Sequence, residues 1–345
     1  MQQFKFRQLS LSHVIATAAS LAVLALTGPA MAADNPIVIK FSHVVAANTP
    51  KGLAADKFKE LAEKYTDGKV KVEVYPNSQL YKDKEELEAL QLGAVQMLAP
   101  SNSKFGPIGI KEFEVFDLPY ILPDLATLRK VTDGPLGAKL LKLLEPKGMI
   151  GLAYWDNGFK QMTANKKLVD PADYKGMKFR IQSSKVLDAQ FRTLGAIPQV
   201  MAFSEVYQAL QTGVVDGTEG VPSNFYTQKI FEVQKHMTLS NHGHLAYAVI
   251  VNKKFWDGLP ADIRTQLEGT IKDATIYANA IASTENGRAL EGIKASGRVS
   301  VYTPTAAETN EWKKALMPVH KEMEGRVGKA TIEAAYKAAS FVAPK

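Results

Sequence analysis

The sequence predicts an α/β protein of two lobes, with a mixed β-sheet in each lobe and a long helix bracing both. Three observations carry this prediction. β-runs alternate with amphipathic helical segments over residues 38–99, and the same alternation returns over residues 160–217. Alternating strands and helices indicate a parallel or mixed sheet with helices on its faces. An apolar stripe of helical spacing then continues over residues 260–296, a helix of about 50 Å that is too long for one small lobe.

The first 32 residues are typical of an export signal. Lys5 and Arg7 supply a positive start, residues 14–26 form an apolar run, and residues 30–32 form an Ala-Met-Ala cleavage site. The run is shorter than the roughly 20 residues that span a bilayer. We therefore expect cleavage after residue 32 and a periplasmic mature protein, with an uncleaved anchor as the alternative.

Composition excludes several classes of function. The formal net charge is +7, without any block of like charges, so nucleic acid is not an expected partner. The chain has no Cys, which excludes disulfides, thiol catalysis and Cys-ligated metals. A chain of this length can instead be stabilised by a large core. We expect a monomer.

The first lobe is predicted over residues 33–157 and 246–285. Its first helix is expected to begin at Pro50, capped by Thr49. Such sheets bind ligands beyond the carboxyl ends of their strands, and His43 and Ser101 lie at two of these ends. The expected strands cover residues 38–41, 70–75, 95–99, 149–155 and 246–252, with further helices over 83–92 and 135–144.

The second lobe is predicted over residues 158–245 and 286–345. A turn at residues 156–158 is expected to carry the chain into it. Ser204 is predicted to cap a helix, and Thr305 with Glu308 forms a capping-box pattern before two C-terminal helices. The expected strands cover residues 160–163, 177–181, 197–201, 214–217 and 299–302, with helices over 186–194, 204–211 and 331–341.

Arg180 lies on the short predicted strand 177–181. Its side chain would take the face of the pleat opposite Phe179, while the apolar residues of the strand fix its place in the sheet. A guanidinium held in this way is a rigid fork suited to a carboxylate. The alternative is an ordinary solvated Arg.

No catalytic constellation is present in the sequence. The nucleophile-elbow, P-loop, dinucleotide and zincin motifs are all missing. His242 and His244 form a possible metal pair, but no nearby run of Asp, Glu or His completes it. We therefore expect no enzyme activity, no cofactor and no metal.

Three segments, residues 158–163, 175–182 and 201–219, carry a family likeness, and shorter ones at 41–45, 75–80 and 99–101 extend it. Through them the chain resembles the TRAP-transporter solute-binding proteins, in particular the DctP-type subunits that bind C4-dicarboxylates. The likeness covers essentially the whole mature chain. It implies two α/β lobes that close around an organic acid and deliver it to a cation-coupled membrane permease.

The resemblance also implies roles for individual residues. Arg180 takes the position that grips the ligand carboxylate, and Lys160 stands where the family often has a second Arg. The first-lobe contacts of the family fall near His43, Asp83 and Ser101. The apolar wall over the ligand's carbon chain falls at a position that is Phe203 here, although ordinary core packing is the alternative for it.

One position departs from the family pattern. Gly220 stands where the family commonly has an Asn that binds the ligand, and Asn224, a backbone amide or a water could substitute for it. Tyr247 could donate its hydroxyl to the distal carboxylate or be a packed core residue.

The expected function is therefore capture of succinate, fumarate, malate or a similar acid. The alternatives are the same role for a sugar acid, 2-oxo acid or aromatic acid, a periplasmic enzyme acting on such an acid, or a subunit that presents it to a sensor.

Overall fold

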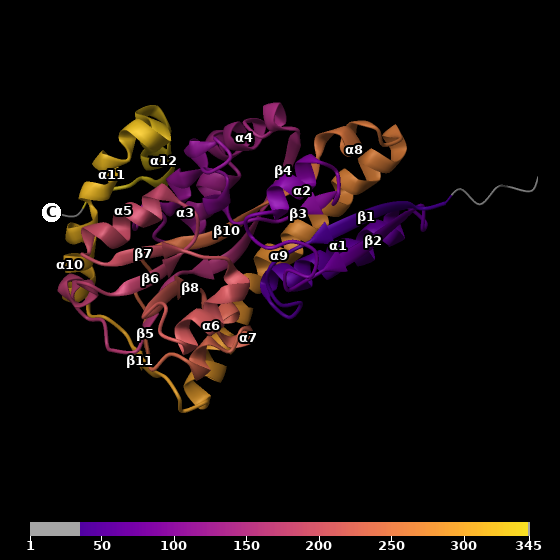
Figure 1. The fold of residues 1–345 in the computed structure, drawn as a ribbon. Coiled ribbons are helices and arrows are strands. Elements are labelled where there is room, and N and C mark those ends of the chain that lie inside the picture. The colour runs from indigo at the N-terminus through magenta and orange to yellow at the C-terminus, as the bar shows by residue number, and fades with distance from the viewer. Residues whose placement is uncertain (1–34, 344–345) are drawn as a thin grey trace, which may run out of the picture. The chain divides into compact units, whose positions relative to one another are not determined.

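Two mixed sheets organise the fold in the computed structural model, which describes residues 35–343 of the chain (Figure 1). The predicted export signal and its cleavage site lie outside these residues. The five-stranded sheet of lobe I has the order β2 (Val70–Tyr75), β1 (Ile37–Ser42), β3 (Met97–Leu98), β10 (His244–Asn252), β4 (Met149–Phe159). The six-stranded sheet of lobe II has the order β11 (Ser300–Tyr302), β9 (His236–Thr238), β5 (Gln161–Ala164), β8 (Gly217–Gly220), β6 (Lys178–Ile181), β7 (Ile197–Val200).

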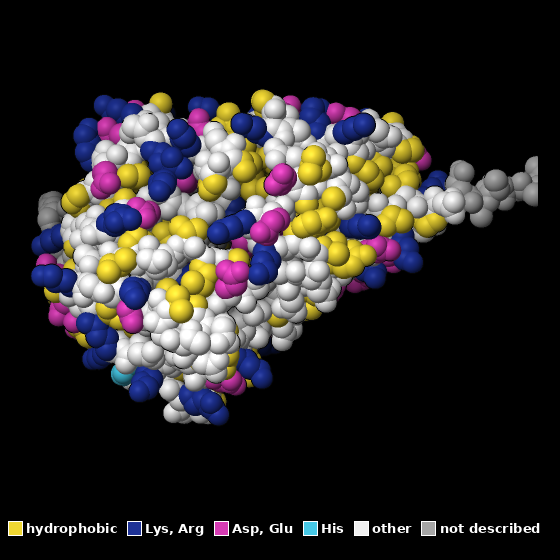
Figure 2. Space-filling model, viewed as in Figure 1, with side chains coloured by type: hydrophobic (Ala, Val, Ile, Leu, Met, Phe, Trp, Pro, Cys, Tyr) yellow, Lys and Arg dark blue, Asp and Glu magenta, His cyan; other side chains and the backbone are white. Residues whose placement is uncertain are grey.

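Helices cover both sheets and connect them. In the described residues they are α1 (Pro50–Tyr65), α2 (Glu86–Gln91), α3 (Leu125–Thr132), α4 (Pro135–Lys142), α5 (Lys185–Thr193), α6 (Val206–Gln211), α7 (Pro222–Thr227), α8 (Lys253–Asp257), α9 (Ala261–Ala295), α10 (Ala306–Leu316), α11 (Pro318–Glu322) and α12 (Lys329–Ala339). None of the helices in this part of the chain is both long enough and apolar enough to cross a membrane. Basic and acidic side chains are interspersed on the face that Figure 2 shows, so no large field of one sign covers it.

The predicted α/β class and the mixed character of the sheets are confirmed. In lobe I, β1 pairs in parallel with β2 and β3, whereas β10 pairs antiparallel with β3 and β4. The chain passes from one sheet to the other between β4 and β5, returns between β9 and β10, and passes over again through α9 before β11. The first two crossings are adjacent, because the backbone N–H of Lys160 donates to the carbonyl of Gly243 at 2.9 Å.

The long helix α9 is confirmed as a brace. It packs against α1 and β4 of lobe I and, further along, against α7 of lobe II (Figure 1). The Asn286 side chain near its end donates to the Asn157 carbonyl at 2.7 Å and accepts from the backbone N–H of Ser223 at 3.0 Å. One buried amide therefore joins β4 to the start of α7.

The hydrophobic core extends from one lobe to the other. In lobe I, Phe41, Phe58 and Trp155 form an aromatic cluster between the sheet and the helices α1 and α9. A larger cluster joins the segment that follows β3 to lobe II, where Phe179 and Phe191 lie 5.0 Å apart between ring centroids. The C-terminal helix α12 packs against α3 and α4, whereas α10 and α11 pack against α5.

Local capping signals in the sequence are also confirmed. The Thr49 side chain accepts from Gly52 N–H at 3.2 Å, with Pro50 at the first position of α1. Thr305 and Glu308 form the predicted capping box of α10. The prediction of two C-terminal helices is wrong, because Pro318 starts a short separate helix and a π-helical segment precedes α12.

The predicted turn at residues 156–158 is wrong, since β4 continues to Phe159 and pairs with β10 along its length. Side chains of α9 form hydrogen bonds with the backbone groups of the two polar residues that suggested a turn. Asp156 donates its backbone N–H to the side chain of Asn279 at 2.8 Å, and Asn286 binds the Asn157 carbonyl.

Two further boundaries in lobe II differ from the prediction. The strand expected over residues 214–217 is β8, which begins only at Gly217. Asp216 instead forms two hydrogen bonds of 2.7 Å with Lys178: its N–H donates to the Lys178 carbonyl, and its carboxylate accepts from the Lys178 N–H. A Cβ on Gly217 would lie 2.4 Å from the Thr163 carbonyl oxygen, so this central position requires glycine. Ser204 does not cap a helix: it is exposed within a 3₁₀ turn that precedes α6.

Candidate functional site

A cavity lies between the two sheets, with walls from both lobes. Its empty volume is about 440 Å³, counting the space that opens to solvent. Lobe I contributes residues from the loop after β1, the start of α1, the segments before α2 and after β3, and β10, while lobe II contributes residues around β6, β8 and α7. The charged side chains that line the cavity are Lys51, Asp83, Lys104, Arg180 and Glu219.

Arg180 lies on β6, between β7 and β8. Its neighbours Phe179 and Ile181 are fully buried in the core on one face, and Arg180 turns to the cavity on the other, as the strand pattern predicts. Its Nε donates to the Met201 carbonyl at 3.0 Å, which fixes the side chain and leaves the terminal nitrogens for a ligand. Burial lowers the pKa of Arg180, but a guanidinium remains charged throughout the physiological range.

Phe203 and Asp83 meet at the cavity from opposite lobes. The backbone N–H of Phe203 donates to the Asp83 carboxylate, and the Phe203 ring lies 5.7 Å from the Arg180 guanidinium carbon. Phe203 is half-buried and lines the cavity, so it forms part of the wall beside the guanidinium.

Asp83 belongs to a buried cluster with Lys104 and Glu86. Lys104 pairs with both carboxylates, the contact to Glu86 being 2.6 Å. Burial alone would raise the pKa of Asp83, but Lys104 and Arg180 hold it at about 2. The same carboxylates raise the pKa of Lys104 despite its burial. The positive charge of Lys104 is therefore already neutralised within lobe I.

Lys51 and Tyr247 form another part of the lobe I wall. Lys51 is 1% exposed, donates from Nζ to the Ala99 carbonyl at 2.9 Å, and lies 3.9 Å from the centroid of the Tyr247 ring. The Tyr247 hydroxyl accepts from the Asn157 side chain at 2.6 Å. An isolated antiparallel bridge joins Tyr247 to Ser101, so both are fixed by backbone pairing.

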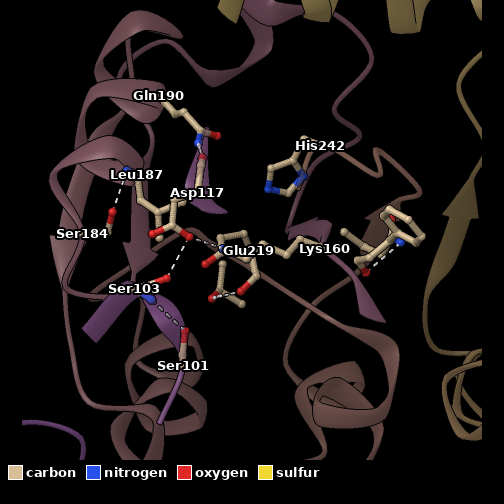
Figure 3. Close-up of polar contacts among 12 residues, drawn as sticks. Ser101, Ser103, Asp117, Lys160, Ser184, Leu187, Gln190, Glu219 and His242 are labelled. Atoms are coloured by element: carbon tan, nitrogen blue, oxygen red, sulfur yellow. Dashed lines mark hydrogen bonds and ion pairs between the residues drawn. The ribbon is translucent and has the colours of Figure 1, made fainter. Parts of the chain in front are cut away.

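Lys160 does not line the cavity. It is 1% exposed at the crossing between the sheets, with Nζ 3.3 Å from Glu219 and 3.4 Å from Asp117 (Figure 3). Ser103 also donates to Asp117, at 2.8 Å. Because Glu219 does line the cavity, Lys160 is placed to act on the site through that carboxylate.

Glu219 is ionised although it is buried. Burial raises its pKa, but the charges of Lys160 and Arg180 lower it below its ordinary value. Burial holds the pKa of His242 at about 4, so the imidazole beside this cluster is neutral at neutral pH. Within the described residues, no group of three potential His, Asp or Glu ligands converges as a metal site would require.

His43 is buried behind the cavity wall and is not among the residues that line it. Burial and the nearby charge of Lys51 lower its pKa to about 3. Neither ring nitrogen has a hydrogen-bond partner in the described part of the chain.

Asn224 and Gly220 both line the cavity. A Cβ on Gly220 would lie 2.9 Å from the Phe225 ring, so the aromatic ring occupies the space that a longer side chain would need. Asn224 lies one turn further on, in α7, and its side-chain oxygen accepts from Asn157 at 3.4 Å. An amide is thus present at the cavity, but it comes from a different backbone position.

The structure therefore brings together six of the eight candidate ligand-binding residues singled out from the sequence: Asp83, Ser101, Arg180, Phe203, Asn224 and Tyr247. It places Lys160 and His43 behind them. Sequence reasoning missed Lys51, Lys104 and Glu219 as lining residues. The signals available for them were a Lys directly after the predicted helix start, a Lys directly after the polar segment 101–103, and a Glu at the end of the recognised segment 201–219.

Comparisons with known proteins agree with this architecture. The sequence model of the bacterial extracellular solute-binding proteins, family 7, matches residues 41–326. The C4-dicarboxylate-binding periplasmic protein DctP of Rhodobacter capsulatus is 66% identical, over 92% of this chain and 94% of that protein.

Two solved structures are similar throughout. A TRAP periplasmic solute-binding protein of Shewanella oneidensis with bound succinate has a TM-score of 0.86 and 45% identity, over 88% of this chain and 100% of that one. A corresponding protein of Pseudomonas aeruginosa with bound L-malate has a TM-score of 0.81 and 45% identity, over 83% of this chain and 100% of that one.

Proposed function

The chain belongs to family 7 of the bacterial extracellular solute-binding proteins, and from that premise we propose that it captures a C4-dicarboxylate such as succinate, fumarate or malate in the periplasm. It then delivers the acid to the membrane subunits of a cation-coupled TRAP transporter. The relatives described above are binding proteins of transporters and not enzymes.

The observation that carries the proposal is Arg180, a buried guanidinium on a strand paired on both sides, which faces the cavity between the lobes. Its backbone position and its Nε are both held, so its terminal nitrogens are oriented before a ligand arrives. Preorganisation reduces the free energy that ordering the site would otherwise cost on binding. Inside the closed cavity the carboxylate and the guanidinium would meet in a lower effective dielectric than at an open surface. Their attraction is therefore stronger inside the cavity.

Ligand capture is coupled to closure of the lobes. Arg180 and Phe203 come from lobe II, and Lys51, Asp83 and Ser101 come from lobe I. A ligand that contacts both walls binds the closed state better than the open one and therefore shifts the equilibrium towards closure. The ring of Phe203 provides an apolar surface for the carbon chain between the two carboxylates.

A thermal-shift screen of organic acids on the purified protein tests the ligand class, because a tight ligand raises the melting temperature by mass action. We expect C4-dicarboxylates to give the largest shifts. A larger shift with a sugar acid, a 2-oxo acid or an aromatic acid would contradict the C4-dicarboxylate assignment and identify that class of acid as the ligand.

Calorimetry of Arg180→Ala tests the site. The variant should lose about 3 kcal/mol or more in binding free energy, roughly a hundredfold in affinity, because the ligand carboxylate would face an empty slot. Arg192→Ala is the matched control, since Arg192 lies on α5 of the same lobe and is exposed. Unchanged dicarboxylate binding by Arg180→Ala would contradict the assignment.

A further inference from the structure

Three cations line the cavity, and two of them have no carboxylate partner in the described part of the chain. Lys104 is paired with Asp83 and Glu86, whereas neither Arg180 nor Lys51 forms an ion pair. A buried charge without a counter-charge is costly. An incoming anion would therefore gain the most binding free energy at two separate positions, beside Arg180 and beside Lys51.

Neutral groups alone hold Lys51 in place. Its ammonium donates to the Ala99 carbonyl at 2.9 Å and lies over the face of Tyr247, a favourable cation–π contact. An ammonium has three N–H donors, and Ala99 uses one of them. The next residue fixes the helix start, because a Cβ on Gly52 would lie 2.2 Å from the Ala47 carbonyl oxygen. Lys51 is thus positioned on the cavity wall without being neutralised.

We infer that Lys51 receives the second carboxylate of the ligand while Arg180 holds the first, so that the cavity selects dianions. This inference rests on the proposed function, since it concerns the same ligand. Lys51 and Arg180 lie on opposite lobes, so a dianion between them also joins the lobes in the closed state. A monocarboxylate would leave Lys51 buried and unpaired.

The charge on Lys51 makes binding sensitive to pH. Burial and the charge of Lys104 lower the pKa of Lys51 to about 7, and the carboxylates Glu86 and Asp83 oppose the shift only in part. The other titratable groups beside it stay neutral near pH 7: His43, whose pKa is about 3, and Tyr247, whose pKa burial raises to about 12.

A carboxylate placed against Lys51 would raise the pKa of its ammonium. Above pH 7 the free protein has largely lost this proton and the complex regains it, so binding takes up a proton. Affinity should then fall as the pH rises above about 7, by up to about tenfold per pH unit.

The decisive experiment is calorimetry with succinate and with its monoamide, succinamate, which replaces one carboxylate with a neutral amide. Wild type should bind succinate about a hundredfold more tightly than succinamate. Lys51→Met should lose about a hundredfold for succinate and should bind the two acids within a few fold of each other. Lys57→Met is the matched control on the same helix, since Lys57 is partly exposed and pairs with Glu60, and it should behave as wild type.

Wild-type titrations at pH 8 in two buffers of different ionisation enthalpy give a readout that needs no variant. Uptake of close to one proton with succinate and none with succinamate supports the inference, and equal uptake with both acids overturns it. A Lys51→Met variant that keeps the wild-type preference for succinate would also overturn it while the proposed function stands. If wild type binds neither succinate nor any other dicarboxylate, that result contradicts the proposed function itself. Ligand-free Lys51→Met should melt no lower than wild type, because a neutral side chain replaces a buried charge.

Discussion

The ammonium group of Lys82 lies 2.9 Å from the carboxylate of Glu205, and this ion pair joins lobe I to lobe II. Both side chains are about half exposed. A second contact between the lobes lies close by and runs in the opposite direction, since the Phe203 N–H of lobe II donates to the Asp83 carboxylate of lobe I. These two polar contacts, one exposed and one part-buried, join the lobes beside the cavity.

Glu205→Gln should weaken dicarboxylate binding by no more than about fivefold, because exposed ion pairs contribute roughly 0–1 kcal/mol. The loss should be seen in a faster dissociation rate, since the contact is made in the closed state, and it should shrink at about 0.5 M salt, where exposed charges are screened. Stopped-flow measurements at low and high salt check this. Glu311→Gln, at an exposed pair within α10, is the control. A loss above a hundredfold would show that the exposed pair, and not the buried contacts, dominates closure.

The fully buried cluster of Lys160, Glu219 and Asp117 leads to a different expectation. Lys160→Met should destabilise the ligand-free protein by about 3–5 kcal/mol, because two buried carboxylates would lose their cation. Urea unfolding without ligand measures it. Adding Glu219→Gln to Lys160→Met should recover part of the loss, since one unpaired charge disappears.

Lys166→Met, at an exposed position shortly after β5, is the control for this series. If Lys160 instead bound the ligand directly, Lys160→Met would leave the stability of the free protein unchanged and lower only the affinity. That result would favour the role that the family resemblance implied for Lys160 over the role that its contacts imply.

The sequence predicted those parts of the fold that depend on local signals. Thr49 with Pro50, and Thr305 with Glu308, mark helix starts through contacts within four residues, and the long apolar stripe of α9 is repeated too often to be misread. The wrong predictions lie where contacts with residues far away in the sequence determine the local structure. Asp156 and Asn157 look like a turn until Asn279 and Asn286 of α9 satisfy their backbone groups, and no local pattern contains that information.

The same distinction applies to the site. Arg180 could be predicted because strand alternation and the family motif both point to it. The positions of Lys160 and Lys51 depend on which acids lie near them in space. Glu219 and Asp117 neutralise Lys160, whereas no carboxylate of the described residues reaches Lys51. Sequence reasoning assigned the carboxylate contact to Lys160, whereas in the structure the lysine with that opportunity is Lys51.

His244, on β10, leads to a prediction about acid stability. Its ring lies edge-on to Phe159 at 5.1 Å, and neither ring nitrogen has a partner within the described residues. Burial, with smaller contributions from Arg129 and Lys160, lowers its pKa to about 3. The unfolded chain would bind a proton at this histidine below about pH 6.5, and the folded protein would not. The free energy of unfolding should therefore fall as the pH drops below 6.5.

His244→Phe removes the titratable imidazole and keeps an aromatic ring beside Phe159. Between pH 6 and pH 4 its free energy of unfolding should fall less steeply than that of wild type, by about 1.4 kcal/mol per pH unit. Urea unfolding at several pH values measures both slopes, and the two proteins should run parallel above about pH 7.5, where this histidine is neutral in both states. Equal slopes below pH 6 would mean that His244 takes up its proton in the folded protein too, which requires a charged imidazole inside the sheet beside Arg129.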